Sequence, residues 1–277
     1  MNPKQIHALY GLKWNPFLSQ IPPEALVKDD STSRFCWRVE QVVLDGGFAL
    51  ITGAPGTGKS VTLRHLLQHL TAMPELCVRT LTRPQSNIRD FYREMGELFE
   101  IPMKYNNRFG AYANLRSQWK SFIKTTLFRP VILIDEAQEA PADVLNEIRL
   151  LSSTDLDSKN ILAVVMAGDN RLLEKLQNDM LKPLESRIRI RHHLDKRPID
   201  ELVQILSQSM AQAGSPQLMN AELIKTVAEH AMGNLRAMMI MGNELLTNAA
   251  EKEIRQLDEN LFFDVYRNAI KKKRGLK

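Results

Sequence analysis

The octapeptide Gly53–Ser60 has the residue types and the spacing of a loop that binds phosphate groups. It reads Gly-Ala-Pro-Gly-Thr-Gly-Lys-Ser and stands between an apolar run at 48–52 and a helical pattern at 61–70. The glycines let backbone N–H groups close around a β-phosphate, Lys59 reaches the β- and γ-phosphates, and the following helix presents its positive end. This strand and helix context distinguishes a nucleoside triphosphate site from a chance glycine turn.

We expect the whole loop and the start of the following helix to contact the nucleotide, which we predict to be ATP with Mg²⁺. The residues concerned are Gly53, Ala54, Pro55, Gly56, Thr57, Gly58, Lys59, Ser60 and Val61. The hydroxyl of Ser60 is the expected Mg²⁺ ligand within this loop.

Two adjacent carboxylates are predicted to complete the site. Asp135 and Glu136 follow the apolar run 131–134, at the carboxyl end of a strand, where ligands gather in an open α/β sheet. Asp135 is expected to hold Mg²⁺, partly through water, and Glu136 to orient and polarise the attacking water. Alternatively, the two acids cap a helix that begins at Ala137. Together with the loop, the pair predicts an enzyme that hydrolyses ATP to ADP and phosphate.

The elements around these motifs predict an α/β fold. Apolar runs at 48–52, 76–81, 131–134 and 161–167 alternate with helical segments. Strands that are apolar on both faces and separated by helices indicate a parallel sheet covered on two sides, which is a three-layer sandwich. Residues 188–190 add a fifth strand with one polar face. After Pro198 only helical patterns follow, and they predict a small all-helical lid domain.

We therefore expect four segments along the chain. They are an N-terminal docked arm at 1–34, the α/β nucleotide-binding domain at 35–197, the helical lid at 198–270 and a basic tail at 271–277. In the arm, the stretch from Gly11 to Phe17 is predicted to be extended. Its residues Trp14, Asn15 and Phe17 either pack beside the adenine or form a hydrophobic latch between the arm and the core.

Composition sets the broad class of the protein. Of 277 residues, 44% are hydrophobic and 25% are charged, as in soluble globular proteins. No apolar run reaches roughly 18 residues, and the N-terminus lacks a signal-peptide pattern, so we expect a cytoplasmic protein with no membrane partner. Cys36 and Cys77 lack zinc-ligand spacing and are expected to be reduced core thiols. The net charge of +5 is compatible with a nucleic-acid partner.

These motifs resemble those of an AAA+ ATPase. The likeness rests on the phosphate loop, the Asp-Glu pair, the strand that ends Met-Ala-Gly-Asp-Asn at residue 170, the segment Leu-Glu-Ser-Arg at 184–187 and the Gly-Asn-Leu-Arg of the lid at 233–236. More narrowly, the opening Gly-Leu-Lys-Trp-Asn-Pro-Phe and the Asp-Glu-Ala-Gln at 135–138 are similar to the ExeA, TniB, TnsC and IstB group, whose members are ATPases of secretion and of DNA transposition.

The resemblance implies further catalytic roles. Asp169, or else Asn170, would be the polar sensor of the γ-phosphate at the end of the fourth strand. The family usually has Asn, Thr or Ser there, and Asp169 could equally cap the next helix. Arg187 would be an arginine finger in a neighbouring subunit's site, which makes the active enzyme an oligomer. Otherwise it is one member of a solvated row with Arg189, Arg191 and Arg197.

Arg236 would be the sensor of the lid, pairing with the nucleotide phosphates. Its alternative is an ordinary surface arginine on a helix.

Basic regions are candidates for contact with a client. Lys104, Arg108 and Arg116 lie among aromatic and amide residues in a predicted loop after Pro102, a composition that suits the phosphate backbone of DNA. A solvated loop with ordinary charge is the alternative. Other basic groups are Arg79, Arg83, Arg89 and Arg93 near the second strand, and the tail from Lys271 to Arg274.

The resemblance implies that the chain forms a ring or helical filament on the backbone of double-stranded DNA in the presence of ATP. There it would recruit or activate a transposase or target-selector protein, and hydrolysis would release it. An ExeA-type secretion ATPase is the alternative, which we expect less because the sequence has no membrane span or peptidoglycan-binding extension. A third possibility is a nucleotide-gated adaptor that scarcely hydrolyses ATP, against which the intact Asp135 and Glu136 argue.

Overall fold

The computed structural model describes residues 2–22, 25–27, 29–104, 106–154 and 159–274, with side chains to residue 266. It divides into two compact units, each described by itself below. The α/β unit contains residues 28–55 and 59–194, and the helical unit contains residues 1–27, 56–58 and 195–277.

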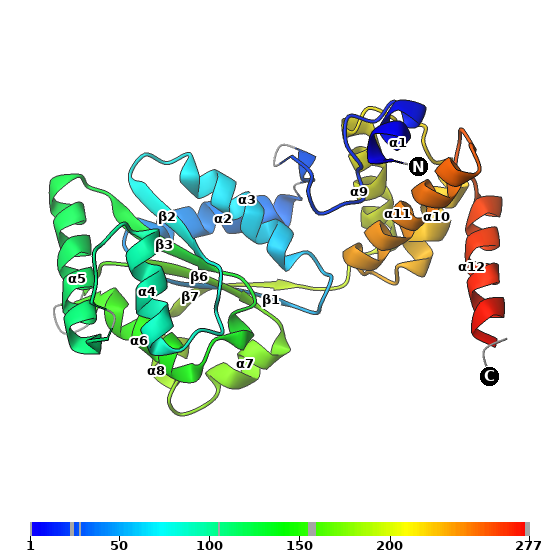
Figure 1. The fold of residues 1–277 in the computed structure, drawn as a ribbon. Helices are drawn as coiled ribbons and strands as arrows, with labels where there is room; N and C mark the ends of the chain where they lie inside the picture. The colour runs from blue at the N-terminus through cyan, green and yellow to red at the C-terminus, as the bar shows by residue number, and fades with distance from the viewer. Residues whose placement is uncertain (1, 23–24, 28, 105, 155–158, 275–277) are drawn as a thin grey trace. The chain divides into compact units, whose positions relative to one another are not determined.

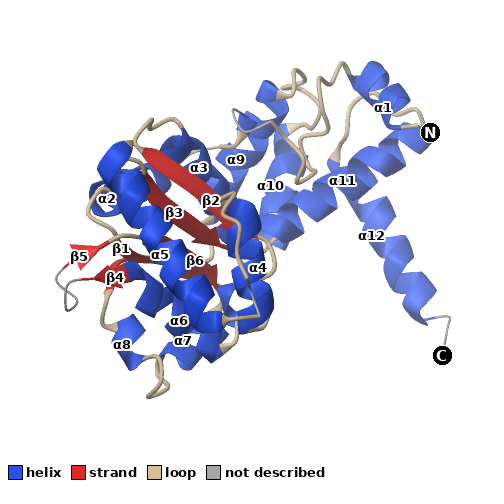
Figure 2. Cartoon of the chain, turned by 60° about the vertical axis from the view of Figure 1, so that its left-hand side comes forward, coloured by secondary structure: helices blue, strands red, loops and turns tan. Residues whose placement is uncertain are grey.

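The α/β unit is built on a five-stranded parallel sheet (Figure 2). Its strands are β1 (Gly47–Gly53), β2 (Leu76–Leu81), β3 (Arg129–Ile134), β6 (Ala163–Gly168) and β7 (Ile188–Leu194), in the spatial order β2-β3-β6-β1-β7. Beside the sheet, β4 (Ser153–Thr154) and β5 (Lys159–Asn160) form a short antiparallel pair. All strands expected from the apolar runs are present, although β6 begins at Ala163 rather than at residue 161.

Helices cover both faces of the sheet, because successive side chains of each strand point to opposite sides. On one face Ile51 and Leu133 pack with α2 (Asp30–Val43) and α3 (Lys59–Thr71). On the other face Leu50 and Ile134 pack in a core with α4 (Ile88–Leu98), α5 (Arg108–Thr125), α6 (Ala142–Ser152), α7 (Asn170–Leu176) and α8 (Lys182–Glu185). Figure 1 shows these layers, and they confirm the predicted three-layer α/β sandwich.

One local prediction was wrong. The basic segment 104–116 was expected to be a loop, but the chain is helical from Arg108 onward as α5. The side chain of Asn107 caps this helix by accepting a hydrogen bond from the Gly110 N–H at 3.0 Å. Ala111, Leu115 and Trp119, at four-residue spacing, are buried in the core, so burial of one helix face decides the structure here.

The helical unit packs around its own apolar core. It contains α1 (Pro3–Tyr10), α9 (Ile199–Gln212), α10 (Ala221–His230), α11 (Leu235–Glu251) and α12 (Glu259–Arg274). The all-helical structure after Pro198 was predicted, whereas α1 was not. Of the expected basic tail, residues 271–274 lie in the backbone of α12, and residues 275–277 are outside the described residues.

Residues of the N-terminal arm pack within the helical unit. Phe17 is 4% exposed, and its ring lies so close to Gly242 on α11 that a Cβ there would come within 2.6 Å of it. Asn15 Nδ2 donates to Asn243 Oδ1 at 2.8 Å, and Tyr10 donates its hydroxyl proton to the Ile254 carbonyl at 2.7 Å. Through these contacts the arm is fastened to the core of the helical unit, as in the latch alternative.

The central strands should dominate the stability of the α/β unit. Leu133 on β3 is 1% exposed, and we expect Leu133→Ala to lower the free energy of unfolding by about 2–5 kcal/mol, because it removes buried methyl groups and leaves a cavity. Leu127→Ala is the matched control, since Leu127 is 72% exposed. Urea unfolding followed by circular dichroism measures both, and equal losses would contradict this core assignment.

Candidate nucleotide-binding site

The phosphate loop connects β1 to α3 and requires its glycines. Gly56 and Gly58 have φ of 85° and 112°, in the left-handed region that side chains with a Cβ rarely adopt. α3 begins at Lys59, so the positive end of a 13-residue helix closes the loop. Lys59 is 7% exposed, and its Nζ donates to the carbonyls of Gly53 at 3.0 Å and Ala54 at 3.2 Å. Within the part of the chain that the structure describes, this buried ammonium group donates to backbone carbonyls, an arrangement that suits an anionic ligand.

The strand register brings the other expected groups to the same edge of the sheet. Thr52 of β1 pairs with Gly168 of β6, and Ile134 of β3 pairs with Met166 of β6. The phosphate loop, Asp135 and Asp169 therefore all follow the carboxyl ends of adjacent parallel strands. That edge is where open α/β sheets bind ligands.

Asp135 and Glu136 do not act as helix caps. Only the three-residue 3₁₀ helix Ala137–Glu139 follows them, without a capping hydrogen bond from a side chain. Asp135 Oδ1 instead accepts from the Glu136 N–H at 2.9 Å. Glu136 has a left-handed backbone with φ of 50°, and its side chain is exposed. This geometry argues against the capping alternative and leaves Glu136 exposed and Asp135 half-buried at the site.

Asp169 is engaged with its own helix. It caps α7 by accepting from the Arg171 N–H at 2.9 Å, and Arg171 Nη2 lies 2.8 Å from its Oδ2. The side-chain hydrogen bond from Arg171 is the main cause that holds the pKa of Asp169 below its usual value. The capping role that the sequence allowed is therefore present, and Asn170 beside it is exposed.

Gln138 is a site residue to which the sequence motif assigned no role. Its side chain is 5% exposed; Nε2 donates to Glu136 Oε2, and Oε1 accepts from the Asp169 N–H at 3.3 Å. The amide therefore connects the turn after β3 with the end of β6. The Asp-Glu-Ala-Gln motif contained the signal, but only the fold reveals its partners.

Arg187 lies at the amino ends of the strands, opposite to the phosphate loop. It directly precedes β7, whose first residue Ile188 pairs with Phe48 near the start of β1. The phosphate loop begins five residues further along β1, roughly 16 Å away at the rise of a strand. Arg187 Nη1 donates to the Pro183 carbonyl at 3.1 Å, and the neighbouring Arg191 pairs with Glu185 at 2.6 Å.

Arg236 belongs to the helical unit. It lies in the first turn of α11 and is exposed, next to the capping residue Asn234, which accepts from the Ala237 N–H at 3.0 Å.

Two of the candidate DNA-binding residues tie α5 to α6. Arg108 donates to both carboxylate oxygens of Glu147, whose side chain is 2% exposed, and Tyr92 donates its hydroxyl proton to the same carboxylate. Burial, followed by this hydrogen bond, raises the pKa of Tyr92. Arg116 Nη1 donates to the Leu150 carbonyl at 2.8 Å. Lys104 is exposed and makes no side-chain hydrogen bond or ion pair with any described residue.

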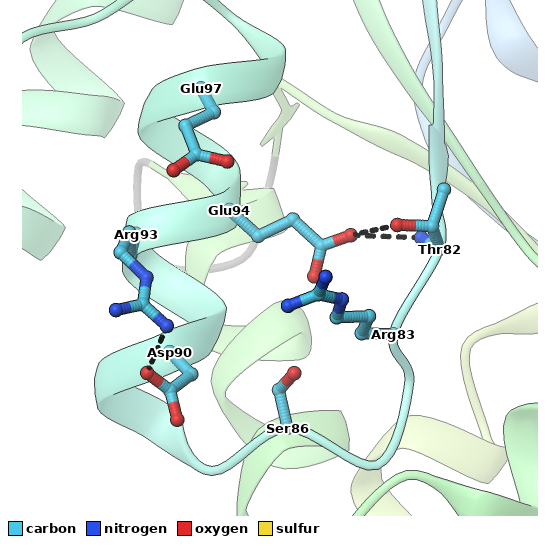
Figure 3. Close-up of a pocket in the computed structure, with 7 residues that line it drawn as sticks. All are labelled: Thr82, Arg83, Ser86, Asp90, Arg93, Glu94 and Glu97. Carbon is cyan, nitrogen blue, oxygen red and sulfur yellow. Dashed lines mark hydrogen bonds and ion pairs between the residues drawn. The ribbon is translucent and has the colours of Figure 1, made fainter.

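Two members of the basic group near β2, Arg83 and Arg93, line a pocket of mixed charge (Figure 3). Arg83 in the loop after β2 extends towards Glu94 on α4, whose Oε1 accepts from the Thr82 N–H at 2.8 Å. Arg93 pairs with Asp90 at 2.7 Å, and Glu97 also lines the pocket. Arg79 is not part of it and donates to the Leu98 carbonyl at 2.6 Å. The acids offset the arginines, so this surface is a weaker candidate for DNA phosphates.

The residues at the site fit a nucleotide-held Mg²⁺ ion. Magnesium is usually bound through one or two carboxylates, several waters and the substrate phosphates, and Ser60 with Asp135 supplies such a donor set. Among the described residues, no three His, Cys, Asp or Glu side chains gather into a complete metal cage. Nor does any helix in the described ranges have the length and hydropathy to cross a membrane.

Comparison with known proteins agrees with this geometry. Residues 43–176 match the family model described as "AAA domain". General secretion pathway protein A of Aeromonas hydrophila is 30% identical over 186 residues, which are 67% of this chain and 34% of that protein. The chain thus spans about a third of the length of this curated relative.

Solved structures of Cdc6p and ORC proteins share the fold. Cdc6p of Pyrobaculum aerophilum has a TM-score of 0.70 at 15% identity, covering 87% of this chain and 67% of that one. The ORC2 protein of Aeropyrum pernix, solved as ADPNP-ADP complexes, has a TM-score of 0.72 at 16% identity, covering 92% and 71%. The ORC1 protein of Aeropyrum pernix in complex with DNA has 0.65 at 14%, covering 89% and 69%. These likenesses show a P-loop AAA+ fold, within which residues 43–176 match the AAA domain model.

Removing the buried ammonium group should abolish nucleotide binding. In Lys59→Ala the phosphates lose their main cation, so we expect calorimetric titration with ATP and Mg²⁺ to show no saturable binding. Lys124→Ala, at an exposed position of α5, is the control and should bind as the unmodified protein does. Unchanged affinity in Lys59→Ala would refute the site.

Proposed function

We propose that the protein is an ATPase whose nucleotide state controls its assembly on double-stranded DNA. The observation that carries the enzymatic part is the register of β1, β3 and β6, because it gathers the phosphate loop, Asp135 and Glu136 at one sheet edge. Lys59 binds the β- and γ-phosphates, while Ser60 and Asp135 hold Mg²⁺, which supplies charge neutralisation on the phosphates when bound. Glu136 orients the attacking water and accepts its proton.

The position of Arg187 supports an oligomeric enzyme. Arg187 lies at the amino edge of the strands, and the phosphate loop lies at the carboxyl edge of the same sheet. An arginine side chain is too short to cross that separation, so Arg187 stabilises transferred charge only in the site of an adjacent copy. We propose a ring or helical filament in which each interface completes one active site.

In the same proposal, Arg236 reports nucleotide state from the first turn of α11, where its exposed guanidinium is suited to phosphate. The sensor at the end of β6 is assigned to Asp169 or Asn170. Because the Asp169 carboxylate is already paired with Arg171, the exposed amide of Asn170 is the better donor towards a γ-phosphate.

Catalysis between copies can be tested by mixing two inactive variants. We expect Arg187→Ala to bind ATP normally but to lose turnover, and Glu136→Gln to do the same, because each removes one half of a shared site. Mixed oligomers contain interfaces with an intact Glu136 from one copy and an intact Arg187 from the other. Phosphate release should therefore reappear on mixing. Turnover in Arg187→Ala alone, or no recovery at any ratio, would contradict an arginine acting in trans.

For the client we propose the phosphate backbone of double-stranded DNA, at a target where the oligomer recruits or activates a transposase. The net charge of +5 and the exposed Lys104 next to the N-terminus of α5 support a DNA contact. Arg108, whose side chain is 59% exposed despite its ion pair, is a secondary candidate. Arg116 is the weakest of the three candidates for DNA contact, because its guanidinium already donates hydrogen bonds to backbone carbonyls.

A secretion ATPase is the second candidate function. It is favoured by the relative described as General secretion pathway protein A, which matches 67% of this chain. The same ATPase cycle would then act on a protein assembly instead of on DNA. The two functions differ in whether ATP promotes DNA binding.

Fluorescence anisotropy of a labelled duplex distinguishes these clients. We expect tight binding with ATP and Mg²⁺, little with ADP or without nucleotide, and weaker binding at higher salt because counterions are released from the phosphates. Lys104→Ala should weaken binding and reduce the salt slope by about 0.9 for each phosphate that the side chain no longer neutralises, whereas Lys124→Ala serves as the control.

Arg108→Ala is unsuitable for this test because it leaves the buried Glu147 carboxylate without its ion-pair partner. Absence of DNA binding under every condition would favour the secretion function. Equal binding by the Lys104 variant would remove that residue from the interface.

A further inference from the structure

The side chain of Gln138 is fixed at both ends. Its Nε2 donates to Glu136 Oε2, and its Oε1 accepts from the Asp169 backbone N–H. The opposite amide orientation would place oxygen against a carboxylate and NH₂ against an N–H, so the network allows only one orientation. A donor to a charged carboxylate forms one of the stronger hydrogen bonds available in a protein.

The surrounding structure is shaped to hold this amide. Gly168 directly precedes Asp169, and a Cβ at Gly168 would lie 2.7 Å from Gln138 Oε1, so a glycine there makes room for the amide. Lys175 on α7 donates to the carbonyls of Gln138 and Ala140, which anchors the backbone of the turn. The amide is therefore buried in a rigid setting although Glu136 is exposed.

Glu136 otherwise has little to fix its direction. Its side chain projects from a left-handed residue into solvent, and the amide of Gln138 is its only hydrogen-bond donor within the described residues. A group that activates water must be held in the productive geometry, since a displacement of about 1 Å can cost roughly 10²-fold in rate.

We propose that Gln138 is a positioning residue, which aims the Glu136 carboxylate at the attacking water and links it to the end of β6. This inference rests on the proposed ATPase function and extends it to a residue that does not itself touch the nucleotide. Gln138 is therefore expected to govern the rate of hydrolysis without contributing to ATP affinity.

Two substitutions distinguish the effect of the Gln138 hydrogen-bond donor from the effect of its side-chain packing. Gln138→Glu keeps the size of the side chain and the acceptor for the Asp169 N–H, but it replaces the donor by a carboxylate that repels Glu136. Gln138→Ala removes the whole bridge. We expect both to lower kcat by roughly 10- to 100-fold and to leave KM for ATP unchanged. Gln177→Glu, the same change at an exposed position beside α7, is the control and should have no effect.

A double-mutant cycle identifies the pathway of the effect. If Gln138 acts through Glu136, adding Gln138→Ala to Glu136→Gln causes no further loss of the residual turnover, because the carboxylate it positions is already gone. Normal kcat in both Gln138 variants, a parallel rise in KM, or an additive loss in the Glu136→Gln background would each overturn the proposal.

A spectroscopic measurement keeps this proposal separate from the ATPase function. The side-chain ¹⁵N–H₂ signals of Gln138 are assigned from their loss in Gln138→Ala, and one proton should be displaced downfield by its bond to the carboxylate. Glu136→Ala should remove that displacement. If the protein has no ATPase activity but the signal moves, the proposed function fails and the bridge stands. If Glu136→Ala leaves the signal unmoved, the bridge itself is refuted.

Discussion

The structure depends on the parallel pairing of β1, β3 and β6 in a register that ends all three strands at one edge. Each strand is buried on both faces, so a slip of one residue would exchange the side chains that face α2 and α3 with those that face α4 and α6. The same register determines where the chain emerges into the loops that follow. The strand register thus determines both how the sheet packs against its helices and where the phosphate loop lies relative to Asp135.

The layer of helices on the second face has its own polar anchor. Glu147 on α6 is almost fully buried and is compensated by Arg108 from α5 and Tyr92 from α4. A buried carboxylate without such partners would be costly, so these three helices are held in a defined arrangement. Because α6 follows the turn that carries Glu136, this anchor also supports the backbone of the site, while the exposed part of Arg108 stays at the surface.

Much of this could be predicted from the sequence because the signals were local. Apolar runs such as 131–134 predicted the strands, and the phosphate loop predicted the turn into α3. The segment after Pro102 was missed because its apolar residues Ala111, Leu115 and Trp119 are separated by polar ones, and a basic composition suggested a loop. The bridge from Gln138 to Asp169 joins residues 31 positions apart, so no local pattern could reveal it. The pairing of Arg108 with Glu147 was hidden for the same reason.

The left-handed backbone of Glu136 sets the catalytic role proposed for this residue against the stability of the fold. With φ of 50°, this position would suit glycine or asparagine, and a glutamate there carries a conformational cost on the order of 1 kcal/mol. An engineering programme that ranked variants of the folded chain by thermal resistance alone would be drawn to replace this residue. The selected variants would have higher thermal stability but would lack the carboxylate proposed to activate water. Activity therefore has to be measured alongside melting temperature.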